Sequence, residues 1–129
     1  MIYLKNGHSI TIGNAGALAS RTHVSYADVS GATLDGSSAI VSSSSATYDV
    51  AAYAAAGTRN VRLVTVTNDG ALAGLFTISH NTGAVTAPIA KAVLQPGQVL
   101  IYSENGGVQV SSAESSTLAT LTLPDTQNP

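Results

Sequence analysis

The stretch Arg59-Asn60-Val61-Arg62-Leu63-Val64-Thr65-Val66-Thr67 decides the fold class of this chain. Most of its residues are β-branched or apolar, which favours an extended strand. Its side chains alternate between two faces, with Val61, Leu63 and Thr65 on one face and Val64 and Val66 on the other. A strand that carries apolar residues on both faces belongs in the middle of a sheet. The stretch therefore predicts a central β-strand.

Downstream of this stretch the sequence predicts a turn and a hairpin. Leu94-Gln95-Pro96-Gly97-Gln98 has the chemistry of a type II turn, because proline presets φ at the first central position and glycine accepts a positive φ at the second. The run at residues 99–102 is followed by a Gly-rich loop and by Val108-Gln109-Val110, which is expected to return antiparallel. Helical periodicity is nearly absent. Short strands at this spacing predict an all-β fold, a sandwich or a barrel.

Upstream, two short apolar runs and one polar segment are less regular. Residues 2–4 and residues 9–12 are separated by Asn-Gly and are expected to pair as a hairpin. Residues 30–45 are rich in Ser and Gly and resemble a flexible linker in composition. Because a strand-like pattern resumes directly after them, they are interpreted as a connecting loop within the domain.

Two further segments leave the element type more open. Residues 49–56 fit a helix, because alanine is the best helix former, or a short strand that runs into a loop. The strand is favoured, because a glycine follows too soon for a stable helix. Residues 85–87 predict a short strand that Pro88 stops.

Charge and length exclude several classes of protein. A chain of 129 residues fits one domain and buries a sizeable core. The formal net charge is only -2, and the few cations are scattered as Lys5, Arg21, Arg59, Arg62 and Lys91. Phosphate binding needs a cluster of such cations on one face, so nucleic acid is not an expected partner. No apolar run approaches the length of a membrane span, so we expect no membrane partner.

The surface of this chain must be dominated by Ser, Thr, Asn and Ala. Only 9% of the residues are charged, whereas a free monomer usually carries about 25%. Such a composition favours a protein whose outer surface meets other protein; a merely bland surface is the alternative. Cysteine is absent, which excludes disulfides and thiolate metal sites and fits a cytosolic origin.

No set of residues in the sequence forms a recognisable catalytic or metal-binding motif. His8, His23 and His80 lie in different segments without a second ligand at the spacing of a zinc site. The carboxylates are single and mostly lie beside turns, as Asp69 does before Gly70. We therefore expect no enzyme activity, no cofactor and no metal. Arg59 and Arg62 on the predicted central strand are expected to form salt bridges within the chain or with a neighbouring subunit.

The C-terminal segment ends in an apolar alternation. Leu118, Leu121 and Leu123 are spaced so that they are hard to leave in water. The segment is either an arm that adds to the sheet edge of a neighbouring copy or a final strand of the same domain. We divide the chain into a β-sandwich domain at residues 1–112 and a Ser/Thr-rich C-terminal arm at residues 113–129.

The order of these segments resembles that of small structural proteins of tailed bacteriophages. The resemblance covers residues 1–112 and is carried by the opening strands at residues 2–12, His23-Val24-Ser25-Tyr26-Ala27-Asp28-Val29-Ser30-Gly31, residues 57–68, the turn and strand at residues 94–102, and Gly106-Gly107-Val108-Gln109-Val110. It implies an all-β fold, a jelly-roll-like or related antiparallel β-sandwich, placed on the virion. The Ser/Thr-rich segment after residue 112 departs from this pattern.

From the resemblance we expect a capsid decoration (cement) protein that binds and stabilises the phage head, located on the capsid surface of the virion and made in the host cytoplasm. Its implied partners are the major capsid protein and further copies of itself, in a homo-oligomer for which a trimer is favoured. The alternative is a tail- or collar-associated adaptor or receptor-binding protein. Extended terminal arms and sheet edges would make the contacts, and the expected interface residues are Ile2, Leu4, Arg59, Arg62, Leu118, Leu121 and Leu123.

Overall fold

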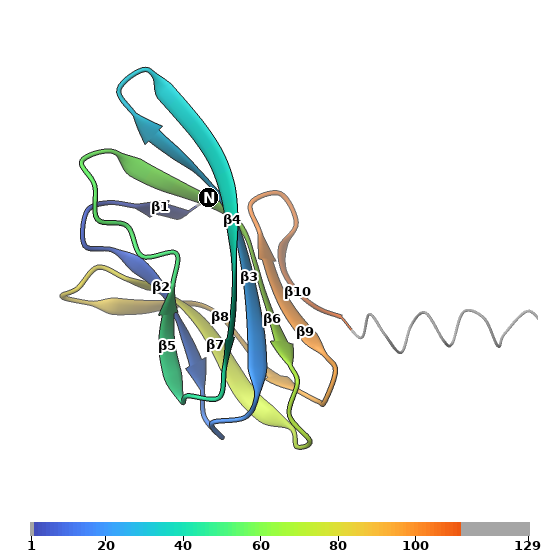
Figure 1. The fold of residues 1–129 in the computed structure, drawn as a ribbon. Helices are drawn as coiled ribbons and strands as arrows, with labels where there is room; N and C mark the ends of the chain where they lie inside the picture. The colour runs from blue at the N-terminus through green and yellow to red at the C-terminus, as the bar shows by residue number, and fades with distance from the viewer. Residues whose placement is uncertain (1, 112–129) are drawn as a thin grey trace, which may run out of the picture.

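The computed structural model describes residues 2–111 as two stacked β-sheets (Figure 1). Sheet A contains β1 (Ile2–Leu4), β3 (Ser20–Ser30), β4 (Thr33–Ser43), β6 (Thr58–Asn68), β9 (Val99–Ser103) and β10 (Gly107–Ser111). Sheet B contains β2 (Ser9–Asn14), β5 (Thr47–Val50), β7 (Gly74–Asn81) and β8 (Thr86–Leu94). Every strand pairing is antiparallel. The predicted all-β antiparallel sandwich is confirmed.

Strand β6 lies in the middle of sheet A, as predicted from its two apolar faces. The strand order is β10-β9-β6-β3-β4, and β1 also pairs with β6. One edge of β6 is occupied by β3. On its other edge β1 pairs with residues 59–61, and β9 takes over at residues 63–67. Residue 62 falls between these two partners.

A β-bulge at Arg62 changes the face on which Val61 lies. In the register with β3, Ser25 is opposite Leu63 and Tyr26 is opposite Val61, which leaves Arg62 as an extra residue. Simple alternation predicts Val61 on the face opposite Val64, and this detail is wrong. Because the extra residue shifts the phase, Val61 is fully buried on the same side as Val64.

The core lies between the two sheets. Its largest fully buried apolar side chains are Leu4, Ile10, Ile12, Val24, Val61, Val64, Val66, Phe76, Ile78, Leu94 and Leu100. Strands of both sheets contribute, so neither sheet buries its apolar face without the other. Burial of each such side chain stabilises the fold by about 1.5–3 kcal/mol before the entropy of ordering is counted.

Three local predictions are wrong, each because of the sheet to which the strand belongs. Residues 2–4 and 9–12 do not form a hairpin, because β1 pairs with β6 in sheet A while β2 pairs with β5 and β7 in sheet B. Residues 30–45 are not a loop, because β4 pairs with β3 along its whole length. The strand at residues 85–87 does not stop at Pro88, because β8 lies at a sheet edge, where the missing N–H of proline is tolerated.

The turn and hairpin predictions near the C-terminal end of the domain are confirmed. Gly97 has a φ of 84°, and the Gln98 N–H donates to the Gln95 carbonyl at 3.0 Å, as in a type II turn. Strands β9 and β10 pair from Gly107 opposite Ser103 to Ser111 opposite Val99. The favoured strand at residues 49–56 is confirmed in part, since β5 ends at Val50 and a loop follows.

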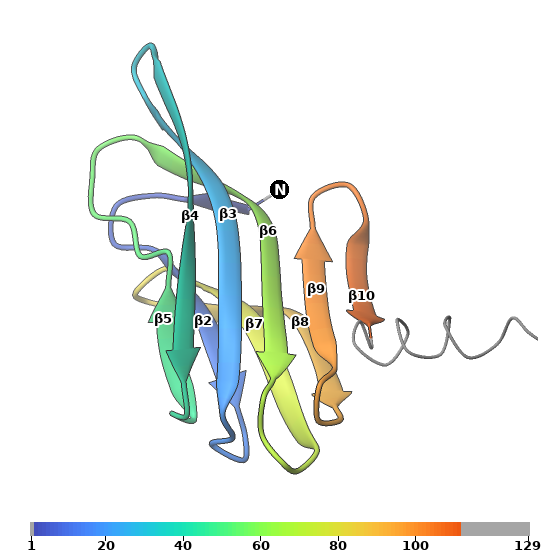
Figure 2. The ribbon, with the colours of Figure 1, turned by 45° about the vertical axis from the view of Figure 1, so that its right-hand side comes forward.

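The β3–β4 hairpin extends beyond the rest of the sandwich as an arm (Figure 2). The side chains from Thr33 to Ser38 are all exposed. Three hairpins, β3–β4, β7–β8 and β9–β10, stay within a sheet, whereas the other connections cross between the sheets. Jelly-roll-like connectivity stays a prediction, and the domain boundary at residue 112 lies at the limit of the described residues.

Asn68 joins two turns at the end of the sandwich opposite this arm. Its side chain is fully buried, and its amide Nδ2 donates to the carbonyls of Leu72 and Leu94, both at 2.9 Å. Its Oδ1 accepts the Gly70 N–H at 2.9 Å. Because every polar group of this side chain is paired, burial of the amide is not penalised. Asn68 therefore holds the β6–β7 turn against the end of β8.

We expect Asn68→Asp to lower the free energy of unfolding by about 3 kcal/mol or more, because a carboxylate oxygen would face two carbonyl oxygens in a buried position. Urea denaturation followed by circular dichroism measures the loss. Asn105→Asp, in the exposed β9–β10 loop, is the matched control and should change the stability by less than about 0.5 kcal/mol. Equal losses for the two variants would contradict this role of Asn68.

Candidate functional site

The outer face of sheet A is hollowed along β3. One hollow of about 410 Å³ is lined by Ser25, Tyr26, Ala27, Leu34, Gly36, Ser37 and Arg62. A second hollow of about 240 Å³ is lined by Arg21, His23, Ile40, Thr65 and Thr67. Both lie over β3, between β4 and β6, and together they are called the outer groove.

The register of three strands explains the groove. On the outer face of β3, Ser25 and Ala27 are small, and Ala27 is opposite Gly36 of β4. The small side chains of β3 therefore form the floor of the groove, and larger side chains of β4 and β6 form its two walls. Leu34 forms part of the β4 wall, and Arg62 forms part of the β6 wall.

Arg62 is placed in the groove by the bulge. Its backbone carbonyl accepts the N–H of Glu104 at 3.0 Å, at the point where the partner of β6 changes from β1 to β9. Bulges often redirect a side chain toward a functional surface. The Arg62 side chain is exposed, and within residues 2–111 it has no ion pair. It is therefore a cation that the fold itself does not use.

Large apolar side chains are exposed beside the groove. The exposed fraction is 67% for Leu34 and 68% for Ile40, both on β4. Tyr3 of β1 is 53% exposed. It lies on the same outer face, because it pairs with Asn60 of β6, and Asn60 pairs with Ala27 of β3. Apolar side chains grouped on one face are typical of a surface that contacts protein.

Arg59, in contrast, is used inside the fold. Its guanidinium donates to both carboxylate oxygens of Asp28, at 2.7 and 2.9 Å. It also lies 3.9 Å from the ring centre of Tyr26 and 5.2 Å from that of Tyr53. The hydrogen bond to Asp28 raises the pKa of Arg59, although burial opposes the rise. The structure thus realises the expected salt bridge within the chain.

The loop between β5 and β6 closes over this cluster. The Arg59 guanidinium also donates to the Ala52 carbonyl at 3.1 Å. The Tyr53 backbone exchanges hydrogen bonds with the β1–β2 turn, donating to His8 at 2.9 Å and accepting from Gly7 at 2.8 Å. The cluster therefore holds the loop and the turn at one end of the sandwich, next to the base of the β3–β4 arm.

The remaining predicted interface residues divide into two groups. Ile2 and Leu4 are 7% and 0% exposed and belong to the core. Their assignment to an interface needs correction, because β1 pairs with β6 and directs both side chains between the sheets. Leu118, Leu121 and Leu123 lie outside the described residues. Of the predicted set, Arg62 alone is shown on an exposed surface.

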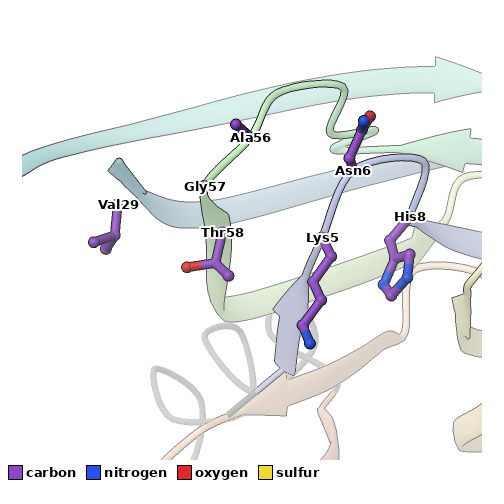
Figure 3. Close-up of a pocket in the computed structure, with 7 residues that line it drawn as sticks. All are labelled: Lys5, Asn6, His8, Val29, Ala56, Gly57 and Thr58. Carbon is purple, nitrogen blue, oxygen red and sulfur yellow. The ribbon is translucent and has the colours of Figure 1, made fainter. Parts of the chain in front are cut away.

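A third hollow, of about 510 Å³, lies at the end of the sandwich near the Arg59 cluster (Figure 3). It is lined by Lys5, Asn6, His8, Val29, Ala56, Gly57 and Thr58. Beside it, Nδ1 of His8 lies 3.0 Å from Nε2 of His80 on β7, so the two rings share a hydrogen bond. Burial and the neighbouring His8 lower the pKa of His80 below its ordinary value of 6.5.

The three hollows are lined by apolar, hydroxyl, amide and basic side chains, and none of the three linings includes a carboxylate. Across residues 2–111 no group of three His, Cys, Asp or Glu side chains is placed to hold a metal ion. The same residues contain no helix long and apolar enough to cross a membrane.

Fold and surface together define a small antiparallel β-sandwich with an exposed groove on one sheet. Searches with protein-family models, among curated proteins and among solved structures returned no significant match to this chain.

Sequence reasoning missed both the outer groove and the histidine pair. The groove depends on β4, which the Ser-rich composition assigned to a loop; the short apolar run Ala39-Ile40-Val41 is the one sequence signal that points to a strand. His8 and His80 lie in separate segments and are brought together by the connection into β2, which pairs with β7.

We expect Gly57→Ala to destabilise the fold by about 1–3 kcal/mol and to loosen the Arg59 cluster. A Cβ at residue 57 would overlap the Val29 carbonyl oxygen and lie 3.0 Å from the Tyr53 hydroxyl, so the backbone must move. Gly36→Ala is the control, because nothing lies within 4 Å of its Cβ. Thermal unfolding should show a lower midpoint for the first variant only; a normal midpoint for Gly57→Ala would contradict this packing.

The His80 pKa makes stability depend on pH in a defined direction. Because folding lowers the pKa of His80, the unfolded chain binds a proton there as pH falls through about 6.5, whereas the folded chain binds that proton only at a lower pH. The free energy of unfolding should therefore decrease as pH falls below this value. His80→Gln should flatten this dependence between about pH 7 and pH 5, whereas His23→Gln on β3 should keep it. Denaturation curves across this range measure both slopes, and an unchanged slope in His80→Gln would refute the assignment.

Proposed function

We propose that this chain is a virion structural protein of a tailed bacteriophage, a capsid decoration protein that binds and stabilises the phage head. The observation that carries this proposal is the outer face of sheet A, where a groove, exposed apolar side chains and an extended hairpin arm lie together in a chain with few charges. This combination suits docking on another protein. The resemblance in the order of segments supplies the virion context.

The placement of the cations favours a protein partner over nucleic acid. Arg59 is paired with Asp28, and Arg21 with Asp69 at 3.2 Å. Lys5 lines the end hollow, while Lys91 lies on β8 of sheet B. Arg62 is thus the groove cation that has no ion pair within residues 2–111, and one such cation fits a carboxylate of a partner protein better than a row of phosphates.

The shape of the surface also fits attachment to a repeating lattice. A standard protein interface buries roughly 800 Å² on each partner, which the outer face of a sheet and a projecting arm can supply together. Individually modest contacts become effectively permanent when many copies bind one particle. The groove offers apolar, hydroxyl and basic side chains for these contacts.

We expect Leu34→Asp to weaken binding to matching empty capsids at least tenfold, because it places a charge at the apolar wall of the groove. The measurement is cosedimentation of the purified full chain with the capsids, quantified by gel densitometry. Leu72→Asp is the matched control, because Leu72 is 68% exposed but lies in the β6–β7 turn, away from the groove. Wild-type occupancy for Leu34→Asp would contradict docking through this face. A wild-type chain that ignores capsids and binds host cells would instead support the tail adaptor.

A further inference from the structure

We propose that copies of this chain join head to tail by strand addition, in which residues 117–123 of one copy pair with the free edge of β4 in the next copy. These residues lie outside the part of the chain that the structure describes, and a second copy is the occupant to which the edge is assigned. Because this contact specifies how the proposed decoration protein would self-associate, it deepens the proposed function and rests on it.

Strand β4 presents a long unpaired edge. It is the last strand of sheet A, and it pairs with β3 over eleven residues. Among the hydrogen bonds within residues 2–111, the only other one that reaches its backbone is from the Ser20 hydroxyl to the Ser43 carbonyl, at 3.2 Å. A row of free N–H and C=O groups is a template for one more strand.

This edge also lacks the features by which proteins normally protect a sheet edge. Exposed edges are usually kept short or carry Lys, Pro or a bulge. Edge strand β8 has Pro88, Lys91 and a register shift, whereas edge strands β5 and β10 are short, with four and five residues against the eleven of β4. Strand β4 contains neither Lys nor Pro, is in continuous register with β3, and has a single charged residue, Asp35, close to the β3–β4 turn and outside residues 37–43. It is therefore the edge of this sandwich that is most open to a partner strand.

The chain itself contains a segment suited to this edge. Thr117-Leu118-Ala119-Thr120-Leu121-Thr122-Leu123 is uncharged, rich in threonine and leucine, and followed by Pro124, which ends a strand. At roughly 3.3 Å per residue, seven extended residues span about 23 Å and fit within β4. Leu121 and Leu123 would share one face and Leu118 the other, and β4 has apolar residues on both faces, with Ile40 outward and Val41 inward.

The place where the described chain ends favours a neighbouring copy over the same copy. Residues 112–129 follow β10, and β10 and β4 are the opposite ends of the strand order in sheet A (Figure 2). Four strand spacings of about 4.8 Å separate these two edges. The residues between Ser111 and Thr117 would have to run fully stretched across an exposed face to reach their own β4. Pairing with the next copy needs no such path and makes a heterologous contact, which closes into a ring or continues as a filament.

Full-length variants test the two sides of the contact by light scattering. Ile40→Lys on β4 and the double variant Leu121→Asp with Leu123→Asp should each shift the wild-type oligomer toward monomer by at least tenfold in dissociation constant. Val93→Lys is the matched control, because Val93 is similarly exposed but lies on β8 of sheet B, and its oligomer should persist. A monomeric wild-type chain, or an oligomer that Ile40→Lys leaves intact, would overturn the contact.

Cross-linking shows whether the contact joins two chains, and the absence of cysteine makes single labels possible. A copy with Ser38→Cys is mixed with a copy with Thr120→Cys and treated with a short bis-maleimide. A covalent heterodimer is expected, and Thr86→Cys on β8, as control for Ser38→Cys, should give none. In a chain that carries both Ser38→Cys and Thr120→Cys, closure only within one chain would overturn the contact between copies. A chain that sediments with capsids as a monomer would overturn this contact but not the decoration function. A chain that assembles without binding capsids would overturn the decoration function but not this contact.

Discussion

Pairing of β6 on both of its edges is the constraint on which the rest of the structure depends. One edge holds β3 and, through it, the β4 arm; the other holds β1 and then β9. A strand that is paired on both edges lies inside its sheet, so its core-facing side chains must suit a buried position. Val61, Val64 and Val66 do, and they are fully buried. The change of partner from β1 to β9 coincides with the bulge at Arg62. The geometry that completes sheet A thus also places Arg62 in the outer groove.

Much of the fold follows from local sequence, because local chemistry specifies strands and turns. The alternation in residues 59–67 indicates the central strand, and Pro96-Gly97 indicates its turn, since each signal lies within a few residues. What local patterns do not specify is the sheet to which a strand belongs. Ile2 pairs with Val61 and not with a strand close in sequence, and this pairing depends on packing between residues that are far apart along the chain. Strand β4 has almost no buried side chains, so it lacks the alternation by which a strand is recognised.

The candidate site was less predictable than the fold for the same reason. Arg62 was predicted as a salt-bridge and interface residue, but nothing near it in sequence indicates the bulge that places it in the groove. The small floor of the groove arises because Ala27 happens to be opposite Gly36, and this register is set by the β3–β4 turn. Arg59 and Asp28 are 31 residues apart and meet only because β3 and β6 are neighbours. Sequence supplies the residue types, and strand register decides which of them meet.

Low charge and an unprotected edge strand both favour association between copies of this chain. The formal net charge is only -2, and within residues 2–111 two of the five cations are paired with carboxylates, so electrostatic repulsion between copies in solution is weak. A soluble monomer with this surface would normally protect β4 with lysines or a proline, because an open edge invites uncontrolled pairing. Here the edge strand is instead polar through serine hydroxyls, which keep it hydrated without repelling another uncharged strand. An edge that is hydrated but not repulsive is stable while alone and remains available to a partner. That balance is the property required of a subunit that must fold first and assemble afterwards.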